Sequence, residues 1–301
     1  MAIALGAHQY GKAETRLVRI YRDGPVHEIR DLNVSTSLRG DFAAAYLDGD
    51  QSLVLPTDSQ KNTAYAFAKQ HGVAEIEDYA LALARHFADD IDPVQAARVE
   101  VDEYRWDRVR AGQEAHPHAF TRAGQEVRTT AVTIAGTGIT QNAWVVSGLR
   151  DLVLLKSTGS EFAGFLRDRY TTLAETHDRV LATALTARWR YREPEADFGP
   201  AYASVRSLLI ERFATVHSLA LQQSLWEMGR AVLAAHPEIA EIRLSAPNKH
   251  HFLVDLTPFG LDNPGEVFHA DDRPYGLIQC AVVQEDAPPA GPAFEDAASF
   301  G

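Results

Sequence analysis

The sequence predicts an α+β fold made of two fused ββααββ units, each an antiparallel sheet with helices packed on one face. Two observations predict it: paired extended runs alternate with paired helical patterns, and this order occurs twice along the chain. The 301 residues are enough for two such units. We place the first unit at residues 1–138 and the second at 139–285. The remainder, 286–301, is rich in Ala, Pro, Gly and Asp and is expected to be a disordered C-terminal tail.

The first unit begins with a predicted β-hairpin. Residues 16–22 alternate between apolar and polar, a turn follows at Asp23-Gly24-Pro25, and a second extended run covers 26–38. The other elements of this unit are predicted as follows: a short strand ending at Leu55-Pro56, a helix capped by Thr57-Asp58-Ser59 that reaches Gly72, a helix over 76–87, and strands over 99–110 and 125–134.

The second unit repeats this order of elements without repeating the amino-acid sequence. Apolar runs within residues 144–155 predict strands, and the cluster Ser157-Thr158-Gly159-Ser160 ends them. The following elements are then predicted: helices over 202–214 and 218–235, and strands over 239–256 and 275–283.

Composition and charge exclude several classes of protein. Lys and Arg number 29 against 41 Asp and Glu, so the net charge is 29 − 41 = −12, which argues against broad binding of nucleic acid or anionic membranes. Basic and aromatic residues interleave at Arg105-Trp106 and over 188–191, and we interpret them as sheet residues. A single cysteine, Cys280, permits no internal disulfide. No stretch reaches the roughly 18 apolar residues of a membrane span.

The sequence also predicts a cytoplasmic location. Its first ten residues lack the basic start and long apolar run of a signal peptide. Its last residues, Ala298-Ser299-Phe300-Gly301, do not form the peroxisomal address Ser-Lys-Leu.

Six short segments depart from plain amphipathic patterning, and together they carry a resemblance. They are Gln9-Tyr10-Gly11-Lys12, the run 56–63, the run 155–162 that contains Glu161 and Phe162, Arg169-Tyr170-Thr171-Thr172-Leu173 with Arg179, Leu221-Gln222-Gln223-Ser224-Leu225-Trp226, and the run 247–256 that contains Asn248 and His250. In order and spacing, from about residue 10 to residue 285, they resemble the urate oxidase (uricase) family. The resemblance implies the tunnelling fold (T-fold), a homotetramer with active sites at subunit interfaces, and oxidation of urate by O2 without a cofactor.

The resemblance also implies which residues bind urate, a flat anionic purine. Phe162 matches the stacking residue of the family, and Arg179 with Gln222 matches its molecular tweezer. The other implied substrate-binding residues are Thr57, Asp58, Leu173, Leu221 and Asn248. Taken singly, Phe162 is typical of a core residue, Arg179 of a solvated charge and Gln222 of a helix-surface residue. Only the three together favour a purine-binding site.

For catalysis, the resemblance implies a proton relay of Lys12, Thr57 and His250, with Asn248 and Thr57 holding O2 and later water. If Asn248 and His250 lie on one strand, their spacing points both to the same face. Histidine suits a proton relay because its side chain titrates near neutral pH. Taken alone, Lys12 is typical of a surface lysine and Thr57 of a helix cap. The products would be 5-hydroxyisourate and hydrogen peroxide, in purine catabolism.

Two alternatives stay open. One is a non-catalytic purine binder, against which the presence of Lys12, Thr57 and His250 argues. The other is a zinc-dependent pterin or purine enzyme of the same fold, which the pairs His116-Pro117-His118 and His250-His251 suggest. These pairs have no third ligand at a convincing offset, so we expect no metal site.

Overall fold

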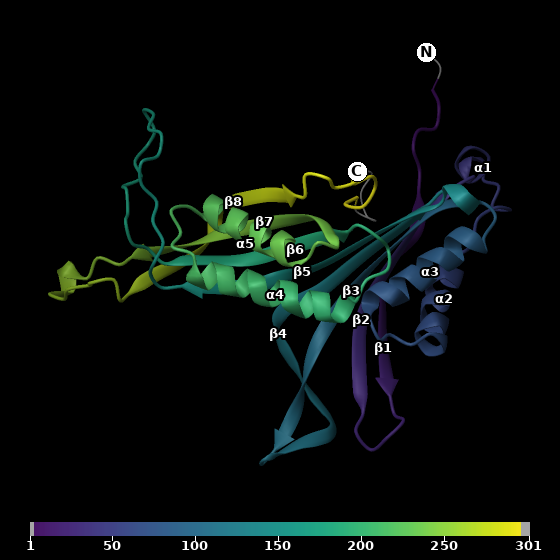
Figure 1. Cartoon of the computed structure of the whole chain (residues 1–301), viewed down its shortest axis with the longest axis horizontal. Helices are drawn as coiled ribbons and strands as arrows, with labels where there is room; N and C mark the ends of the chain where they lie inside the picture. The colour runs from purple at the N-terminus through teal and green to yellow at the C-terminus, as the bar shows by residue number, and fades with distance from the viewer. Residues whose placement is uncertain (1–2, 296–301) are drawn as a thin grey trace. The chain divides into compact units, whose positions relative to one another are not determined.

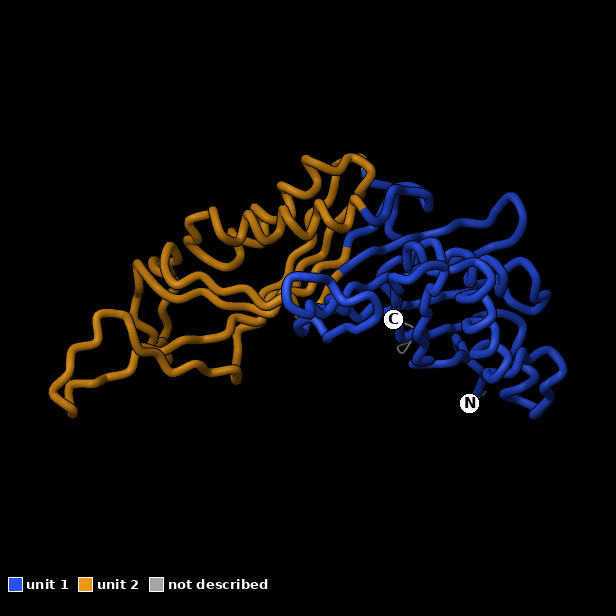
Figure 2. The backbone as a smooth tube through the Cα atoms, turned by 90° about the horizontal axis from the view of Figure 1, so that it is seen from below, with its two compact units in different colours: residues 1–148, 189–199, 287–301 blue, residues 149–188, 200–286 orange. Residues whose placement is uncertain are grey.

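The computed structural model describes residues 3–295 of the chain. Its elements follow the predicted order, with two strands, helices and two strands, then the same again. The eight strands are neighbours in chain order from β1 to β8, and the β1–β2, β2–β3, β3–β4 and β7–β8 pairs are antiparallel. The antiparallel α+β class is thus confirmed, whereas the repeat boundary at 138/139 stays a prediction. Contacts divide the chain differently, into one compact unit of residues 1–148, 189–199 and 287–301 and a second of 149–188 and 200–286 (Figure 2).

The first unit contains four long strands joined as two hairpins: β1 (Tyr10–Tyr21), β2 (Glu28–Gly40), β3 (Val94–Ala111) and β4 (Glu114–Ala135) (Figure 1). Their apolar residues alternate, and one set is buried, as with Leu32, Val34, Val99 and Val101. The hairpins were predicted, but each strand is longer than its apolar run. Polar residues extend the strands because the ladder hydrogen bonds involve only the backbone.

Helices α2 (Thr57–Gln70) and α3 (Ile76–Asp89) pack on this sheet, α2 against β1 and α3 against β3 and β4. The apolar stripe of α3 is fully buried, with Ile76, Leu83 and Phe87 at 0% exposure. Two predictions here were wrong. No strand ends at Leu55-Pro56, and a short helix, α1 (Ala43–Leu47), lies upstream instead. The helix α2 begins after Pro56 with no side-chain cap, so Thr57 is its first residue and not its N-cap.

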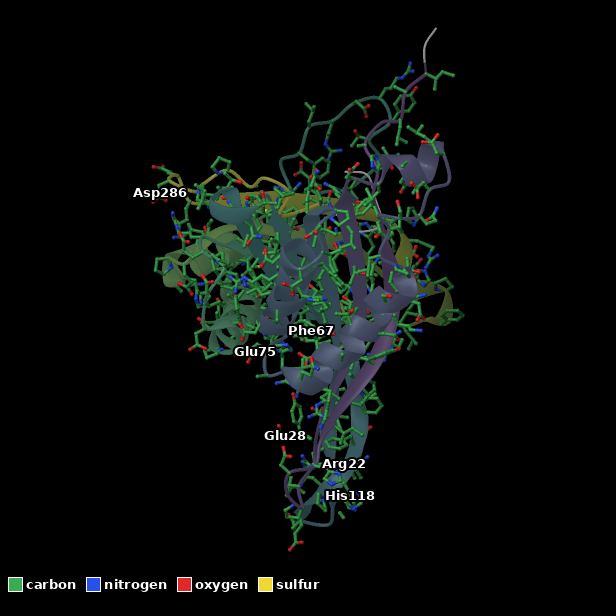
Figure 3. The ribbon with its side chains drawn as sticks, turned by 90° about the vertical axis from the view of Figure 1, so that its right-hand side faces the viewer. Arg22, Glu28, Phe67, Glu75, His118 and Asp286 are labelled. Carbon is green, nitrogen blue, oxygen red and sulfur yellow. The ribbon has the colours of Figure 1, made fainter. Side chains whose placement is uncertain are left out.

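The far ends of the two hairpins of the first unit lie together, where Figure 3 labels Arg22, Glu28 and His118. The His27 amide donates to the Pro117 carbonyl at 2.8 Å, and Arg108 donates to the carbonyl oxygens of His27, His116 and Pro117. The rings of His116 and His118 are 4.5 Å apart and meet edge to face. These histidines therefore support the packing of hairpin ends. Residues 3–295 hold no group of three or more His, Cys, Asp or Glu placed to bind a metal ion.

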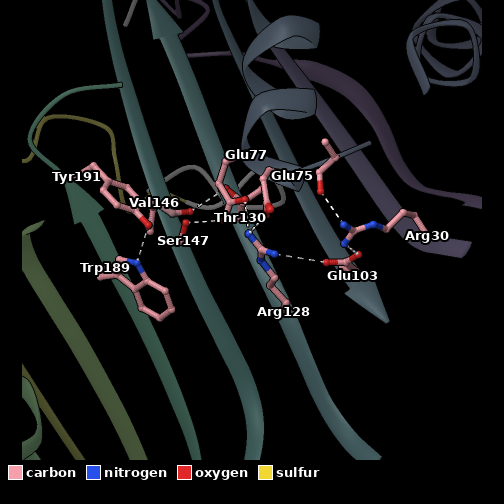
Figure 4. Close-up of polar contacts among 11 residues, drawn as sticks. Arg30, Glu75, Glu77, Glu103, Arg128, Thr130, Val146, Ser147, Trp189 and Tyr191 are labelled. Carbon is pink, nitrogen blue, oxygen red and sulfur yellow. Dashed lines mark hydrogen bonds and ion pairs between the residues drawn. The ribbon is translucent and has the colours of Figure 1, made fainter. Parts of the chain in front are cut away.

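A buried ion network crosses the first unit (Figure 4). Arg128 on β4 donates to Glu75 and to Glu77, each at 2.7 Å, and Glu77 also accepts from the hydroxyl of Ser147. Glu77 is fully buried, and burial raises its pKa against the opposing effect of Arg128. Because a buried charge is tolerated only when it is paired, this network fixes α3 on the sheet.

The second unit also consists of paired strands and paired helices. Its strands are the latter part of β5 (Asn142–Lys156), most of β6 (Leu181–Tyr191), β7 (Ile239–Leu253) and β8 (Phe268–Val283), and its helices are α4 (Phe198–Thr215, nearly all of it) and α5 (Leu221–Ala235). The short 3-10 helix η2 (Thr257–Phe259) belongs to this unit, and η1 (Gly138–Thr140) belongs to the first. The two apolar runs of 144–155 form one strand, β5, and residues 188–191 lie in β6 as interpreted. Helix α5 packs so closely on β8 that a Cβ at Gly229 would lie 2.5 Å from Val282.

The C-terminal segment differs from its prediction. Residues 287–295 belong to the first unit, where Ala293 is 1% exposed and packs with Ala131 and Val146. Arg98 donates to the carbonyl oxygens of Pro292 and Ala293, and Glu295 pairs with Arg39 at 2.7 Å. The predicted disorder is therefore wrong for 287–295, because backbone carbonyls supply partners that composition does not reveal. Residues 296–301 lie outside the described residues.

Candidate active site

Lys12 lies on β1 at a break in its pairing with β2. The register shifts between Lys12 and Thr15, where Glu14 adopts a positive φ of 55°. The Lys12 amide donates to the hydroxyl of Thr36 at 3.2 Å, and that hydroxyl donates to Gln60 on α2 at 2.7 Å. Gln60 is fully buried, so this chain of bonds ties Lys12 to the first turn of α2.

That first turn holds Thr57 and Asp58, both exposed. Asp58 accepts hydrogen bonds from Lys61 and Asn62, and its pKa is lowered by Lys61 first, then by Asn62 and by the charge of Lys12. The Thr57 hydroxyl has no hydrogen-bond partner among residues 3–295. Lys12, Thr57 and Asp58 therefore form one cluster on the first unit, with a hydroxyl and backbone N–H groups of a helix start available to a ligand.

Phe162 and Arg179 lie together on the second unit. The Arg179 guanidinium carbon is 5.6 Å from the centroid of the Phe162 ring, and Phe162 stacks on Phe165 at 5.0 Å. Arg179 is half-buried, and burial lowers its pKa, but guanidinium stays charged at neutral pH. Its Nε is buried without a hydrogen-bond partner, and no carboxylate pairs with it among the described residues. The site therefore presents an unpaired cation beside an aromatic ring.

Backbone hydrogen bonds join the segments that carry these two residues. Phe162 and Thr176 exchange amide and carbonyl bonds at 2.8 and 3.0 Å, and the Arg179 amide donates to the Ser160 carbonyl at 2.9 Å. The Glu161 amide donates to the Ser218 carbonyl at 2.7 Å, just before α5 begins. Residues distant in sequence are thereby brought next to each other.

The start of α5 places Leu221 and Gln222 differently. Leu221 is 2% exposed and packs in the core, whereas Gln222 beside it is exposed. Because the side chain of Leu221 is buried, only its main chain is available for contact with a ligand. Leu173 lies in the loop after β5 and is 54% exposed.

Asn248 and His250 both lie on β7, as predicted. The His250 ring stacks on Phe252 with centroids 5.6 Å apart, so these two side chains share a face. The pairing with β8 is irregular between them, since Asn248 faces Gly276 and His250 faces Asp271. A shared face for Asn248 and His250 stays a prediction.

Sequence reasoning missed one cluster beside the site. Glu161 contacts His217 at 2.5 Å and His177 at 3.1 Å. A charged residue directly before the stacking aromatic was a signal, but its histidine partners lie 16 and 56 residues away. Spacing rules for one helix or strand do not detect such partners.

The chain matches the sequence model of the uricase family over residues 8–133 and 145–279. It is 53% identical over 298 residues to the uricase of Arthrobacter globiformis, across 99% of this chain and 96% of that one. It is 36% identical over 281 residues to the uricase of Danio rerio, across 92% and 93% of the two chains.

Solved structures agree with these matches. The crystal structure of the Arthrobacter globiformis uricase has a TM-score of 0.93 at 52% identity, covering 98% of this chain and 100% of that chain. A crystal structure of urate oxidase from Bacillus sp. TB-90 has a TM-score of 0.83 at 25% identity, covering 92% and 100%.

Fold and matches together define an oxidoreductase of the tunnelling fold. The chain belongs to the uricase family, and its activity is the oxidation of urate with O2 as the acceptor. Among residues 3–295, no helix is long and apolar enough to cross a membrane.

Proposed function

We propose that urate binds between the cluster of Phe162, Arg179 and Gln222 on one chain and the cluster of Lys12, Thr57 and Asp58 on a neighbouring chain. The observation that carries the proposal is the unpaired guanidinium of Arg179 over Phe162. A buried donor without a partner is uncommon in proteins, and an anionic ring with acceptors along one edge satisfies it.

In this proposal, Phe162 stacks on the purine, while Arg179 and Gln222 donate to the carbonyl and ring nitrogen on one edge. Leu221 contributes its backbone, which agrees with its burial. Thr57 and Asp58 contact the opposite edge from the first turn of α2, where backbone N–H groups are free. Leu173 borders the ring from the loop.

Proton transfer is assigned to Lys12, Thr57 and His250. The hydroxyl of Thr57 makes no helix-capping hydrogen bond, so it is free to donate and accept a proton, as a relay member must. Asn248, together with Thr57, holds O2 and then water. One urate, one O2 and one water give one 5-hydroxyisourate and one H2O2, so two electrons pass from the purine to oxygen. Positioning and electrostatic stabilisation by these residues supply the rate enhancement.

The proposal includes a homotetramer with active sites at subunit interfaces. Its support is that the two clusters belong to different compact units, the first with Lys12 and Thr57 and the second with Phe162, Arg179 and His250. A mixture of Thr57→Ala and Arg179→Ala chains should then regain partial activity through mixed sites. Absence of rescue after proven subunit exchange would contradict shared sites. The cytoplasmic location stays a prediction.

The direct test follows urate absorbance and peroxide together, in air, with chelator-treated protein. Equal loss of urate and gain of peroxide supports cofactor-free oxidation. Binding of urate without turnover would favour the purine binder, and activity restored only by added zinc would favour the pterin-type alternative.

A further inference from the structure

Glu161 lies at the meeting point of the three segments that carry the proposed urate-binding side chains. It directly precedes Phe162. Its Oε2 is 3.1 Å from Nδ1 of His177, two residues before Arg179. Its Oε1 is 2.5 Å from Nε2 of His217, five residues before Gln222. One carboxylate thus contacts the segments of both tweezer residues and adjoins the stacking residue.

We propose that Glu161 is a positioning residue that fixes the spacing of Phe162, Arg179 and Gln222 through its two histidine contacts. The proposal rests on the urate-binding roles proposed above for these three residues. Glu161 itself does not touch the substrate. It acts by holding His177 and His217, and with them the adjoining segments.

The side-chain contacts of Glu161 add to backbone bonds that join the same segments. The backbone bonds attach residues 160–162 to Thr176 and Arg179, and they attach Glu161 to Ser218. The side-chain attachments to His177 and His217 further restrict how these segments lie relative to one another. Lys156 adds to this restriction by donating to the Val216 carbonyl at 2.6 Å, immediately before His217. Because a misplacement of about 1 Å can cost about 100-fold in activity, small displacements of these segments matter.

The protonation states suit this role. A carboxylate only accepts hydrogen bonds, so each contacting ring nitrogen must carry the proton. The contacts with His217 and His177 lower the pKa of Glu161, which therefore remains charged across the neutral range. Asp178, next to His177 in the sequence, accepts instead from Thr158 and the Gly159 amide. Among residues 3–295, His177 and His217 are the titratable groups that contact Glu161.

The contacts contribute little to folding. The side chains of His177 and His217 are 77% and 57% exposed, and exposed ion pairs add little to stability. The loss of Glu161 should therefore alter geometry at the site without unfolding the chain. This separates a positioning role from a structural one.

The test measures KM and kcat for urate in Glu161→Ala, His217→Ala and the double variant. We expect Glu161→Ala to raise KM about 10-fold with kcat within about twofold, because contacts made equally in ground and transition states are weakened. The double variant should be no worse than Glu161→Ala, because Glu161→Ala already removes the contact with His217. Glu175→Ala is the matched control: Glu175 lies in the same loop, is 39% exposed, and its one ion pair within residues 3–295 is with Arg167, at 3.7 Å.

Glu161→Gln supplies a readout that a purely structural role would not move. Its amide oxygen can still accept a hydrogen bond from one histidine, and its NH2 group can donate to a ring nitrogen that carries no proton. The KM of Glu161→Gln should therefore lie between those of the unaltered protein and Glu161→Ala, with kcat unchanged. A KM as high as that of Glu161→Ala would overturn the proposal.

The remaining outcomes are distinct. Wild-type KM in Glu161→Ala, or a lower unfolding midpoint with unchanged KM, would also refute the positioning role. Failure of the unaltered protein to oxidise urate would instead refute the proposed function itself.

Discussion

Replacing Arg179 by Ala should chiefly weaken urate binding. In the structure this guanidinium is half-buried, has no carboxylate partner among the described residues and lies 5.6 Å from the Phe162 centroid. Its charge is therefore available to the anion. Removing one partner of a desolvated charge pair costs about 2–5 kcal/mol. Since Arg179 remains partly open to solvent, the lower part of that range, about 2–3 kcal/mol, applies.

That free energy corresponds to a rise in KM of about 30- to 150-fold, at about 1.4 kcal/mol per factor of ten. The assay is initial-rate loss of urate absorbance over a wide range of urate concentration. Arg179→Lys should recover part of the loss, because it keeps the charge but not the two parallel donors.

The matched control is Arg230→Ala. Arg230 lies on α5 in the same unit, is 59% exposed and pairs with Glu227 within its own helix. It should leave KM unchanged. If Arg179→Ala has a normal KM, or if Arg230→Ala raises KM equally through the loss of overall charge, the reasoning from an unpaired guanidinium is refuted.

Three further predictions concern the relay, the buried network and the core. Lys12→Met should lower kcat near neutrality and matter less at high pH, where urate loses its second proton unaided; an unchanged kcat at pH 7 would remove Lys12 from the relay. Glu77→Ala should lower the free energy of unfolding by about 3 kcal/mol, because Arg128 keeps only part of its pairing, through Glu75 and the more distant Glu103; a variant that unfolds in urea with wild-type stability would contradict this. Phe87→Ala should cost about 3–5 kcal/mol in the same assay, since Phe87 is fully buried, and a loss under 1 kcal/mol would show that the site collapses to fill the cavity.

Much of the fold could be predicted because periodicity records burial. The stripe from Ile76 to Phe87 and the alternation around Val99 and Val101 correspond to α3 and β3. The helix α1 was missed because five residues without a buried side chain leave no stripe. The ends of β3 and β4 were missed because their outer pairs depend on backbone bonds between polar residues.

The candidate site was predicted through the resemblance more than through local pattern. Individually, Phe162, Arg179 and Gln222 have ordinary neighbours in the sequence, and only the structure shows that Arg179 has no ion partner in the described part of the chain. The cap assigned to Thr57 was wrong because Ser, Thr and Asp favour both the N-cap and the first turn of a helix. The role of Glu161 depends on tertiary proximity, which no local rule contains.

The first compact unit is discontinuous along the chain, and this has a consequence for biosynthesis. Its core includes Trp189 from one segment and Ala293 from another, nearly 300 residues after the start. Translation delivers the chain from the N-terminus at about 5–20 residues per second. Part of the apolar surface of the early sheet therefore stays uncovered until residues 287–295 have been synthesised and released. A holding chaperone has its longest opportunity on this half of the molecule, and truncation before Ala293 should yield chains that aggregate.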